Sequence, residues 1–266
     1  MIFVIKKINI ALSIVIAFLI SCLVEINKWY MIYIPILTFI CSYIGLIALY
    51  FLFLVISSLT IKKKEYESLN PFYRLVFNLS LEVLSDYGRV KVKIDGKDKV
   101  PNKPCLFVYN HRSRFDPMII SYKFAKWKIV QISKPENFNI PVANRYMMRN
   151  CFLPIDRENA REAIKTINKA SDFITQKGYS VGVSPEGTRN HNPELLPFKS
   201  GCFKIALKSC VPIVVCTLTN FDKIHKNFPW KRTKVNIKID VINYEQIKDL
   251  NTAEISEIVK EKMEEK

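Results

Sequence analysis

Two long uncharged stretches near the amino terminus constrain this chain more than any other feature. Residues 8–24 and residues 29–61 contain no Asp, Glu, Lys or Arg, so the runs are 17 and 33 residues long. A helix of about 20 apolar residues spans the hydrocarbon core of a bilayer. The shorter run is marginal for a span, whereas the longer run can cross with tilt. The two runs therefore predict a membrane-embedded helical hairpin over residues 1–61.

A cleaved signal peptide is the alternative interpretation of residues 1–24. No small-x-small cleavage site follows the first run, and a longer apolar run comes immediately after it. Both observations favour a retained hairpin that spans the bilayer or dips into one leaflet. Lys6 and Lys7 precede the hairpin, and 62–64 is a lysine triplet. Since positive flanks stay cytoplasmic, the rest of the chain is expected at the cytoplasmic face of a membrane, the plasma or inner membrane in a bacterium.

The basic charge is concentrated after the hairpin. The net charge is +16, and residues 62–252 carry all of it. Such a surface can attract anionic headgroups, nucleic acid or an acidic partner. The adjacent hairpin favours lipid, and the absence of a zinc-finger, RNA-binding or helix-turn-helix signature argues against nucleic acid.

The cysteine and histidine patterns give no sign of a metal or other cofactor. The seven cysteines are odd in number and form no CxxC pair, which agrees with a reducing compartment. His191 and His225 have no acidic or Cys neighbours at metal-ligand spacing, so both are expected to be loop residues.

Residues 62–266 have the pattern of a single α/β domain. Strict alternation of apolar residues predicts strands over 90–94 and 235–241. Between them lie short apolar runs at 105–109, 129–132, 152–155, 179–183 and 212–218. Helical segments separate several of these runs, which is typical of a mostly parallel sheet flanked by helices.

Three helices are predicted around this sheet. Residues 65–86 show apolar residues at helical spacing and form either a membrane-surface helix or an ordinary core-covering one. Residues 159–177 have an apolar face that ends at Gly178. Asn251 and Glu254 form a candidate capping box for a final amphipathic helix.

A candidate catalytic pair follows the run at 105–109. The sequence Asn-His-Arg-Ser-Arg-Phe-Asp-Pro at 110–117 places His111 and Asp116 on one turn at the carboxyl end of a strand, where α/β folds build their sites. A carboxylate that accepts from one imidazole nitrogen orients the ring and leaves the other nitrogen as a general base. Taken alone, this spacing is common by chance and favours an exposed loop His and a helix-capping Asp.

Three further clusters follow predicted strands in a fixed order. They are Ile-Asp-Arg at 155–157, Ser-Pro-Glu-Gly-Thr-Arg at 184–189 and Val-Pro-Ile-Val at 211–214. With His-x4-Asp in front, the ordered set resembles the four-motif signature of the glycerolipid acyltransferases. In particular it is similar to that of the 1-acylglycerol-3-phosphate acyltransferases, over about residues 105–220.

The resemblance implies transfer of a fatty acyl group from acyl-CoA or an acyl carrier protein to the sn-2 hydroxyl of 1-acylglycerol 3-phosphate, giving phosphatidic acid. His111 is implied to be the base and Asp116 its orienting partner. The acceptor would be bound by the remaining motif residues, namely Arg157, Glu186, Gly187, Thr188, Arg189 and Pro212. Guanidinium groups suit a phosphate monoester because they donate paired hydrogen bonds. Glu186, which cannot pair with phosphate, is expected to hold a glycerol hydroxyl or brace Arg189.

Several alternatives remain open at this level. Another acceptor, such as glycerol 3-phosphate or a different lysophospholipid, fits the same motifs, and Ser184 departs from the family pattern. A hydrolase with Ser113 as nucleophile has poor spacing and lacks a Gly-x-Ser-x-Gly elbow. A non-catalytic lipid-binding protein would have no need of an oriented base. The basic, aromatic segment 223–234 is either a solvated loop or a contact for anionic lipid or an acidic carrier protein.

Overall fold

The computed structural model describes residues 4–24, 26, 28–156, 159–190, 192 and 194–265. The chain divides into two compact units, residues 1–62 and residues 63–266. Each unit has its own internal packing and is described separately.

The first unit is a pair of apolar helices that contact one another. Helix α1 (Val4–Leu23) and helix α2 (Tyr33–Leu59) are joined through the short 3-10 helix η1 (Trp29–Ile32). Both helices are long and apolar enough to cross a bilayer. Large apolar side chains such as Phe18 and Leu23 are 66% and 83% exposed. Because water is a poor solvent for such a surface, the pair indicates membrane association.

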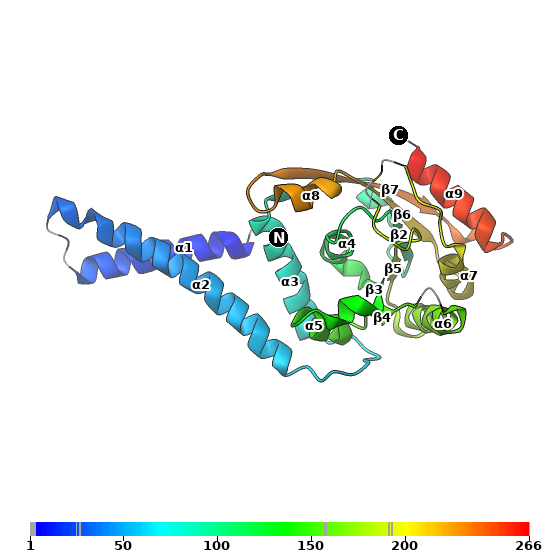
Figure 1. Ribbon diagram of the computed structural model, residues 1–266, viewed down its shortest axis with the longest axis horizontal. Coiled ribbons are helices and arrows are strands. Elements are labelled where there is room, and N and C mark those ends of the chain that lie inside the picture. Colours follow the sequence, from blue (N-terminus) through cyan, green and yellow to red (C-terminus); the bar gives the residue numbers. More distant parts are fainter. Residues whose placement is uncertain are drawn as a thin grey trace. The chain divides into compact units, whose positions relative to one another are not determined.

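The second unit is built on a seven-stranded sheet with the order β1-β7-β6-β2-β5-β3-β4 (Figure 1). The strands are β1 (Val90–Asp95), β2 (Leu106–Tyr109), β3 (Val130–Ser133), β4 (Leu153–Pro154), β5 (Val181–Val183), β6 (Ile213–Thr219) and β7 (Thr233–Ile242). Every neighbouring pair is parallel except β6 and β7. The carboxyl ends of β2, β5 and β3 therefore meet at one edge of the sheet, which we term the carboxyl edge.

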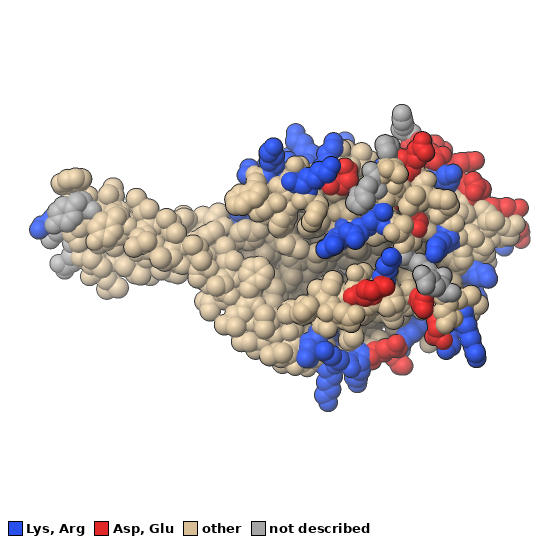
Figure 2. Space-filling model, viewed as in Figure 1, with Lys and Arg blue, Asp and Glu red and all other residues tan. Residues whose placement is uncertain are grey.

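Helices cover both faces of the sheet (Figure 1). The α-helices of this unit are α3 (Pro71–Tyr87), α4 (Asp116–Lys123), α5 (Ala143–Arg149), α6 (Ala160–Lys177), α7 (Lys204–Ser209), α8 (Asp222–Asn227) and α9 (Thr252–Glu264). Short 3-10 helices lie at Lys97–Lys99, Ala125–Trp127, Pro135–Asn139, Ser200–Phe203 and Tyr244–Gln246. Charge is unevenly spread over these elements, because acidic side chains gather over α9 (Figure 2).

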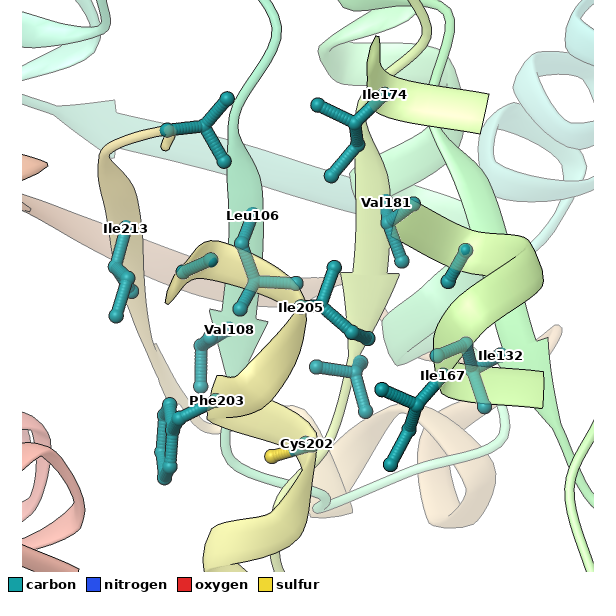
Figure 3. Close-up of a cluster of buried hydrophobic side chains, with 14 of the residues drawn as sticks. Leu106, Val108, Ile132, Ile167, Ile174, Val181, Cys202, Phe203, Ile205 and Ile213 are labelled. Carbon is teal, nitrogen blue, oxygen red and sulfur yellow. The ribbon is translucent and has the colours of Figure 1, made fainter. Parts of the chain in front are cut away.

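Strand β2 lies at the centre of the core and contributes side chains to both faces. Leu106 and Val108 belong to a cluster with residues of α6 and α7 (Figure 3), and this cluster also includes residues of α9. Phe107 and Tyr109 point the other way, into a cluster with residues of α4 and α8. All four side chains are at most 2% exposed. A strand buried on both faces has to read as a continuous apolar run, which is the pattern found at 105–109.

The structure confirms the predicted α/β class with its mostly parallel sheet. It also confirms the helix over 160–177, which ends at Gly178 in a left-handed conformation, and the capping box of Asn251 and Glu254. The first helix of the domain is shorter than the predicted 65–86. It begins at Pro71 because the Asn70 side chain accepts from the backbone N–H of Tyr73 and caps the helix there.

Short helices are the elements that the sequence reading missed. Helices α5, α7 and α8 have six or seven residues each, too few to show a helical period. His225, expected in a loop, lies on α8 and is exposed, whereas His191 lies outside the described residues.

Candidate active site

The candidate site lies at the carboxyl edge of the sheet. Strand β2 ends at Tyr109, and the chain runs through Asn110 and His111 into α4, which begins at Asp116. Asn110 fixes the start of this loop, because its side-chain amide exchanges two hydrogen bonds with the backbone of Leu218 at the end of β6, at 3.1 and 2.7 Å. The loop therefore leaves the sheet in a defined direction.

His111 and Asp116 are in direct contact. The Nδ1 atom of His111 lies 2.8 Å from Oδ2 of Asp116, whose side chain is fully buried. The backbone N–H groups of Arg112 and Ser113 donate to the same oxygen at 2.6 and 2.7 Å. Since the ionised carboxylate can only accept, Nδ1 carries the proton and Nε2 is left with its lone pair. The imidazole is thus held in one orientation and is still partly open to solvent.

The environment of Asp116 is costly for a charge. Burial raises the pKa of this carboxyl, and the hydrogen bonds from His111, Ser113 and Arg112 act in the opposite direction without cancelling the shift. Its second oxygen, Oδ1, is buried without a hydrogen-bond partner in the described part of the chain. An imidazolium at His111 is the group that best stabilises such a carboxylate, so the pair favours protonation of His111 during a reaction.

Glu186 holds the His111 loop from the other side. Its Oε1 atom accepts the backbone N–H of His111 at 2.8 Å, and its Oε2 atom accepts from Asn190 Nδ2 and the Leu196 N–H at 3.0 and 3.2 Å. The N–H of Asn190 donates in turn to the carbonyl of His111 at 2.7 Å. Glu186 is only 3% exposed. These contacts favour a positioning role for Glu186 over the predicted contact with substrate or with Arg189.

The turn after β5 presents the rest of the Pro-Glu-Gly-Thr-Arg motif. Gly187 has φ +74°, a left-handed conformation that glycine adopts without strain, and its N–H donates to the Ser184 carbonyl at 3.3 Å. This turn buries Glu186 and leaves Thr188 and Arg189 exposed. The guanidinium of Arg189 is therefore accessible to a ligand at the same edge as His111. Arg157, the other predicted phosphate ligand, lies outside the described residues.

Pro212 lies at the opposite edge of the sheet. It is buried directly before β6, and its carbonyl accepts the N–H of Leu106, the first residue of β2. Because β2 and β6 are parallel, Pro212 is separated from His111 by the length of β2. This position favours an indirect role of Pro212 in the placement of β6 over contact with substrate.

Two asparagines at the site escaped the sequence analysis. Asn110 and Asn190 are 3% and 2% exposed. The Asn110 side chain ties its loop to Leu218 of β6, and Asn190 bonds Glu186 through its side chain and the His111 carbonyl through its backbone N–H. A polar amide directly beside His111, or directly after Arg189, was the only available signal. Asn is common in surface loops, so the sequence could not distinguish these two residues from ordinary loop residues. Their hydrogen bonds in the folded domain reveal their role.

A third buried amide lies next to the loop that carries His111 and Asp116. Gln131 on β3 is fully buried, accepts from the hydroxyl of Tyr109 at 2.8 Å and donates to the carbonyl of Pro117 at 3.2 Å. It therefore links β2 and β3 to the first turn of α4, next to Asp116. Nothing in the apolar run 129–132 distinguished this residue from a tolerated polar position.

Comparisons with known proteins agree with this geometry. A family profile described as Acyltransferase matches residues 91–219. The chain is 31% identical over 226 residues to the probable 1-acyl-sn-glycerol-3-phosphate acyltransferase of Mycoplasma pneumoniae, covering 76% of this chain and 84% of that protein. It is 36% identical over 148 residues to the chloroplastic 1-acyl-sn-glycerol-3-phosphate acyltransferase BAT2 of Brassica napus, and the match spans 41% of that longer protein.

The fold is also that of a solved structure. The crystal structure of the 1-acyl-sn-glycerophosphate acyltransferase PlsC from Thermotoga maritima superposes with a TM-score of 0.58 over 98% of this chain and 97% of that chain, at 19% sequence identity. The ordered motifs, the sheet and the extent of the Mycoplasma match lead to one assignment. The chain belongs to the 1-acyl-sn-glycerol-3-phosphate acyltransferase family.

Proposed function

We propose that this protein transfers a fatty acyl group from an acyl thioester to the sn-2 hydroxyl of 1-acylglycerol 3-phosphate and so makes phosphatidic acid. The observation that carries this proposal is the contact of 2.8 Å between His111 Nδ1 and a fully buried Asp116 at the carboxyl edge. The relatives named above act, according to their names, on 1-acyl-sn-glycerol 3-phosphate, which supports the same acceptor here.

His111 Nε2 takes the proton of the acceptor hydroxyl as the hydroxyl oxygen attacks the thioester carbonyl carbon. The tetrahedral intermediate then collapses, the C–S bond breaks, and the thiolate receives the proton from the His111 imidazolium. Asp116 holds the ring and stabilises its transient positive charge. The reaction needs no covalent enzyme intermediate, and Ser113 is unsuited to provide one because its side chain is only 5% exposed.

Arg189 binds the phosphate of the acceptor. Arg189 comes two residues after Gly187, and its side chain is exposed. The same turn buries Glu186, which accepts the backbone N–H of His111. A guanidinium can donate two parallel hydrogen bonds to phosphate oxygens, which gives orientation as well as affinity. On the motif order, Arg157 is a second phosphate ligand. The donor is acyl-CoA or an acyl carrier protein thioester.

The catalytic domain lies on the cytoplasmic side of its membrane. The lysines on both flanks of the hairpin support this orientation. Cys210 is exposed on the domain and offers a direct test. A membrane-impermeant maleimide should label Cys210 in opened vesicles and leave it unlabelled in intact cells. Labelling of Cys210 in intact cells, absent from a Cys210→Ser control, would reverse the orientation.

A thiol-release assay tests the reaction. Solubilised wild type and His111→Ala are offered acyl-CoA and acyl carrier protein thioesters with 1-acylglycerol 3-phosphate, glycerol 3-phosphate or a zwitterionic lysolipid. We expect release that depends on 1-acylglycerol 3-phosphate and falls by about 10²–10⁴-fold in the variant, the usual contribution of a general base. Release without an acceptor would indicate hydrolysis. Undiminished release by folded His111→Ala would remove His111 as the base, and preference for another acceptor would change the substrate assignment.

A further inference from the structure

The segment between β6 and β7 carries a dense group of exposed basic side chains around one exposed tryptophan. We define the basic tip by its members, Lys223, Lys226, Trp230, Lys231, Arg232 and Lys234. All six are exposed, and Trp230 is 81% exposed. Asp222 is the only acidic residue in 221–234. Figure 2 shows basic side chains gathered over α8, in contrast to the acidic surface of α9.

The basic tip is a built structure whose tryptophan points outward. Ile224 of α8 is fully buried in the core, and Asn227 Nδ2 donates to Thr233 Oγ1 at 3.0 Å. Arg89 donates from Nη1 to the carbonyl of Trp230 at 2.8 Å. The backbone around Trp230 is thus held in place, while its indole ring contributes almost nothing to the core. The indole ring is therefore accessible to a contact outside the domain.

The basic tip lies at the carboxyl edge of the sheet. Thr219, the last residue of β6, pairs with Asn236 near the start of the antiparallel β7. The chain before β7 therefore stands beyond the carboxyl end of β6, and hence beyond that of its parallel neighbour β2. The ring of Phe228 lies 5.8 Å from the ring of Phe115, which sits between His111 and Asp116 in the sequence. Phe228 lies between Lys226 and Trp230 in the sequence, so the segment that carries the basic tip contacts the His111 loop.

The positive charge of the tip is not neutralised within the domain. Among the described residues, none of its lysines or Arg232 forms an ion pair. Lys234 also lies beside Lys91 in the register of the β1–β7 pair, and both side chains are exposed. Adjacent like charges repel, and an anionic surface placed against them removes that repulsion.

We propose that the basic tip is an interfacial membrane-binding element, which places Trp230 at headgroup level and binds anionic lipid headgroups through its Lys and Arg side chains. An exposed Trp among basic residues favours a bilayer over an acidic protein, because indole rings concentrate at the membrane interface and basic residues are attracted to anionic leaflets. Binding of the basic tip places the carboxyl edge next to the membrane surface that contains the lipid acceptor. The proposal does not depend on which acceptor or donor is used.

Fluorescence quenching in full-length protein tests the insertion of Trp230. The chain has three tryptophans, and Trp29→Phe leaves Trp230 and the partly buried Trp127, whose Nε1–H donates to Pro101. This variant is reconstituted into phosphatidylcholine vesicles, with or without phosphatidylglycerol, that contain brominated lipid. The difference in quenching between Trp29→Phe and Trp29→Phe/Trp230→Phe reports Trp230. We expect strong quenching with phosphatidylglycerol that weakens in high salt.

Charge variants with a matched control test the role of the basic residues. Lys226→Gln/Lys231→Gln/Arg232→Gln should weaken the phosphatidylglycerol-dependent quenching of Trp230 by about tenfold or more, since each basic residue near an anionic surface contributes. Lys103→Gln/Lys128→Gln/Lys177→Gln removes the same charge from exposed positions before β2, β3 and β5, at the opposite edge. This control should retain the quenching.

Two results would overturn the proposal. Trp230 quenching that is absent, or equal in both vesicle types, would exclude an interfacial element that selects anionic lipid. If quenching is absent and the triple tip variant instead raises KM for acyl carrier protein thioesters with no change for acyl-CoA, the surface binds an acidic carrier protein. Loss of acyl transfer in His111→Ala with Trp230 quenching retained would show that membrane binding by the basic tip is independent of the catalytic role of His111.

Discussion

Strand β5 is flanked by two glycines with positive φ, one before the strand and one after it, and their surroundings differ. Before β5, Gly178 closes α6 with φ +66°, and its N–H donates to the carbonyls of Ile174 and Phe173. After β5, Gly187 has φ +74° and forms the turn that buries Glu186 next to His111. The same backbone conformation ends a helix at one edge and places Glu186 against the His111 loop at the other. Helix termination and the candidate site therefore lie at opposite edges of one sheet.

The contrast extends to the polar groups of the two edges. At the amino edge, backbone and hydroxyl groups satisfy one another, as when Ser180 Oγ accepts the N–H of Cys105 at 3.1 Å. At the carboxyl edge, Asp116 and Glu186 are buried, and Oδ1 of Asp116 has no hydrogen-bond partner among the described residues. Such a group destabilises the fold and is retained where the chemistry needs it.

The largest effect should come from Asp116→Asn, which breaks the chemistry of the carboxyl edge and spares the fold. Loss of the carboxylate removes the partner of the imidazolium and should lower kcat/KM by about 10²–10⁴-fold. Burial raises the pKa of Asp116, so its ionisation opposes folding as pH rises above its unfolded value. The variant should unfold at an equal or higher temperature than wild type at neutral pH, and this advantage should vanish near pH 4 and below, at about the unfolded pKa of Asp.

Thermal unfolding and acyl transfer, measured on the same preparations across that pH range, check this prediction. A variant that unfolds well below wild type at neutral pH would show that Asp116 stabilises the loop rather than straining it.

Ile205→Ala should lower stability without a direct effect on the candidate site, because it truncates a fully buried side chain of the core cluster in Figure 3. Truncation of a buried Ile typically costs about 2–5 kcal/mol. Ile164 on α6 is 50% exposed, and Ile164→Ala serves as the matched control with a loss of about 1 kcal/mol or less. Differential scanning fluorimetry should separate the two variants, while the kcat of the folded Ile205→Ala protein stays close to wild type. Equal shifts in Tm would contradict the core assignment.

Arg189→Ala should act on substrate binding alone. The side chain is exposed and makes no contribution to the core, so Tm should not change. Loss of a charge-assisted contact of about 1.5 kcal/mol corresponds to roughly tenfold in KM for a phosphate-bearing acceptor. Arg189→Lys, which keeps the charge without the paired donors, should fall between the two. An equal loss with a phosphate-free lysolipid would contradict the phosphate role.

The smallest and sharpest test is the pair Gly178→Ala and Gly187→Ala. A left-handed conformation costs an alanine about 1 kcal/mol, so both variants should lose a similar amount of stability. Only Gly187→Ala should lower kcat/KM, because its turn holds Glu186 against the backbone of His111. Parallel unfolding and kinetic measurements decide this, and equal kinetic effects of the two substitutions would remove the distinction between the edges.

The sequence by itself determined the apolar helix pair, the strands, the longer helices and the order of the motifs. Each of these rests on local patterns, such as the uninterrupted runs before residue 62 and the alternation of Val235, Ile237 and Ile239. The pairing of His111 with Asp116 was also within reach, since five residues of one loop separate them.

Only the tertiary structure decided how the motifs are used. Glu186 reaches the His111 N–H across 75 positions of sequence, and Pro212 is carried to the far edge because β6 runs parallel to β2. The antiparallel β7 brings the basic tip to the catalytic edge, although more than 100 residues separate Trp230 from His111. Strand order and direction depend on how helices pack on both faces of the sheet at the same time. A local sequence pattern does not contain this information.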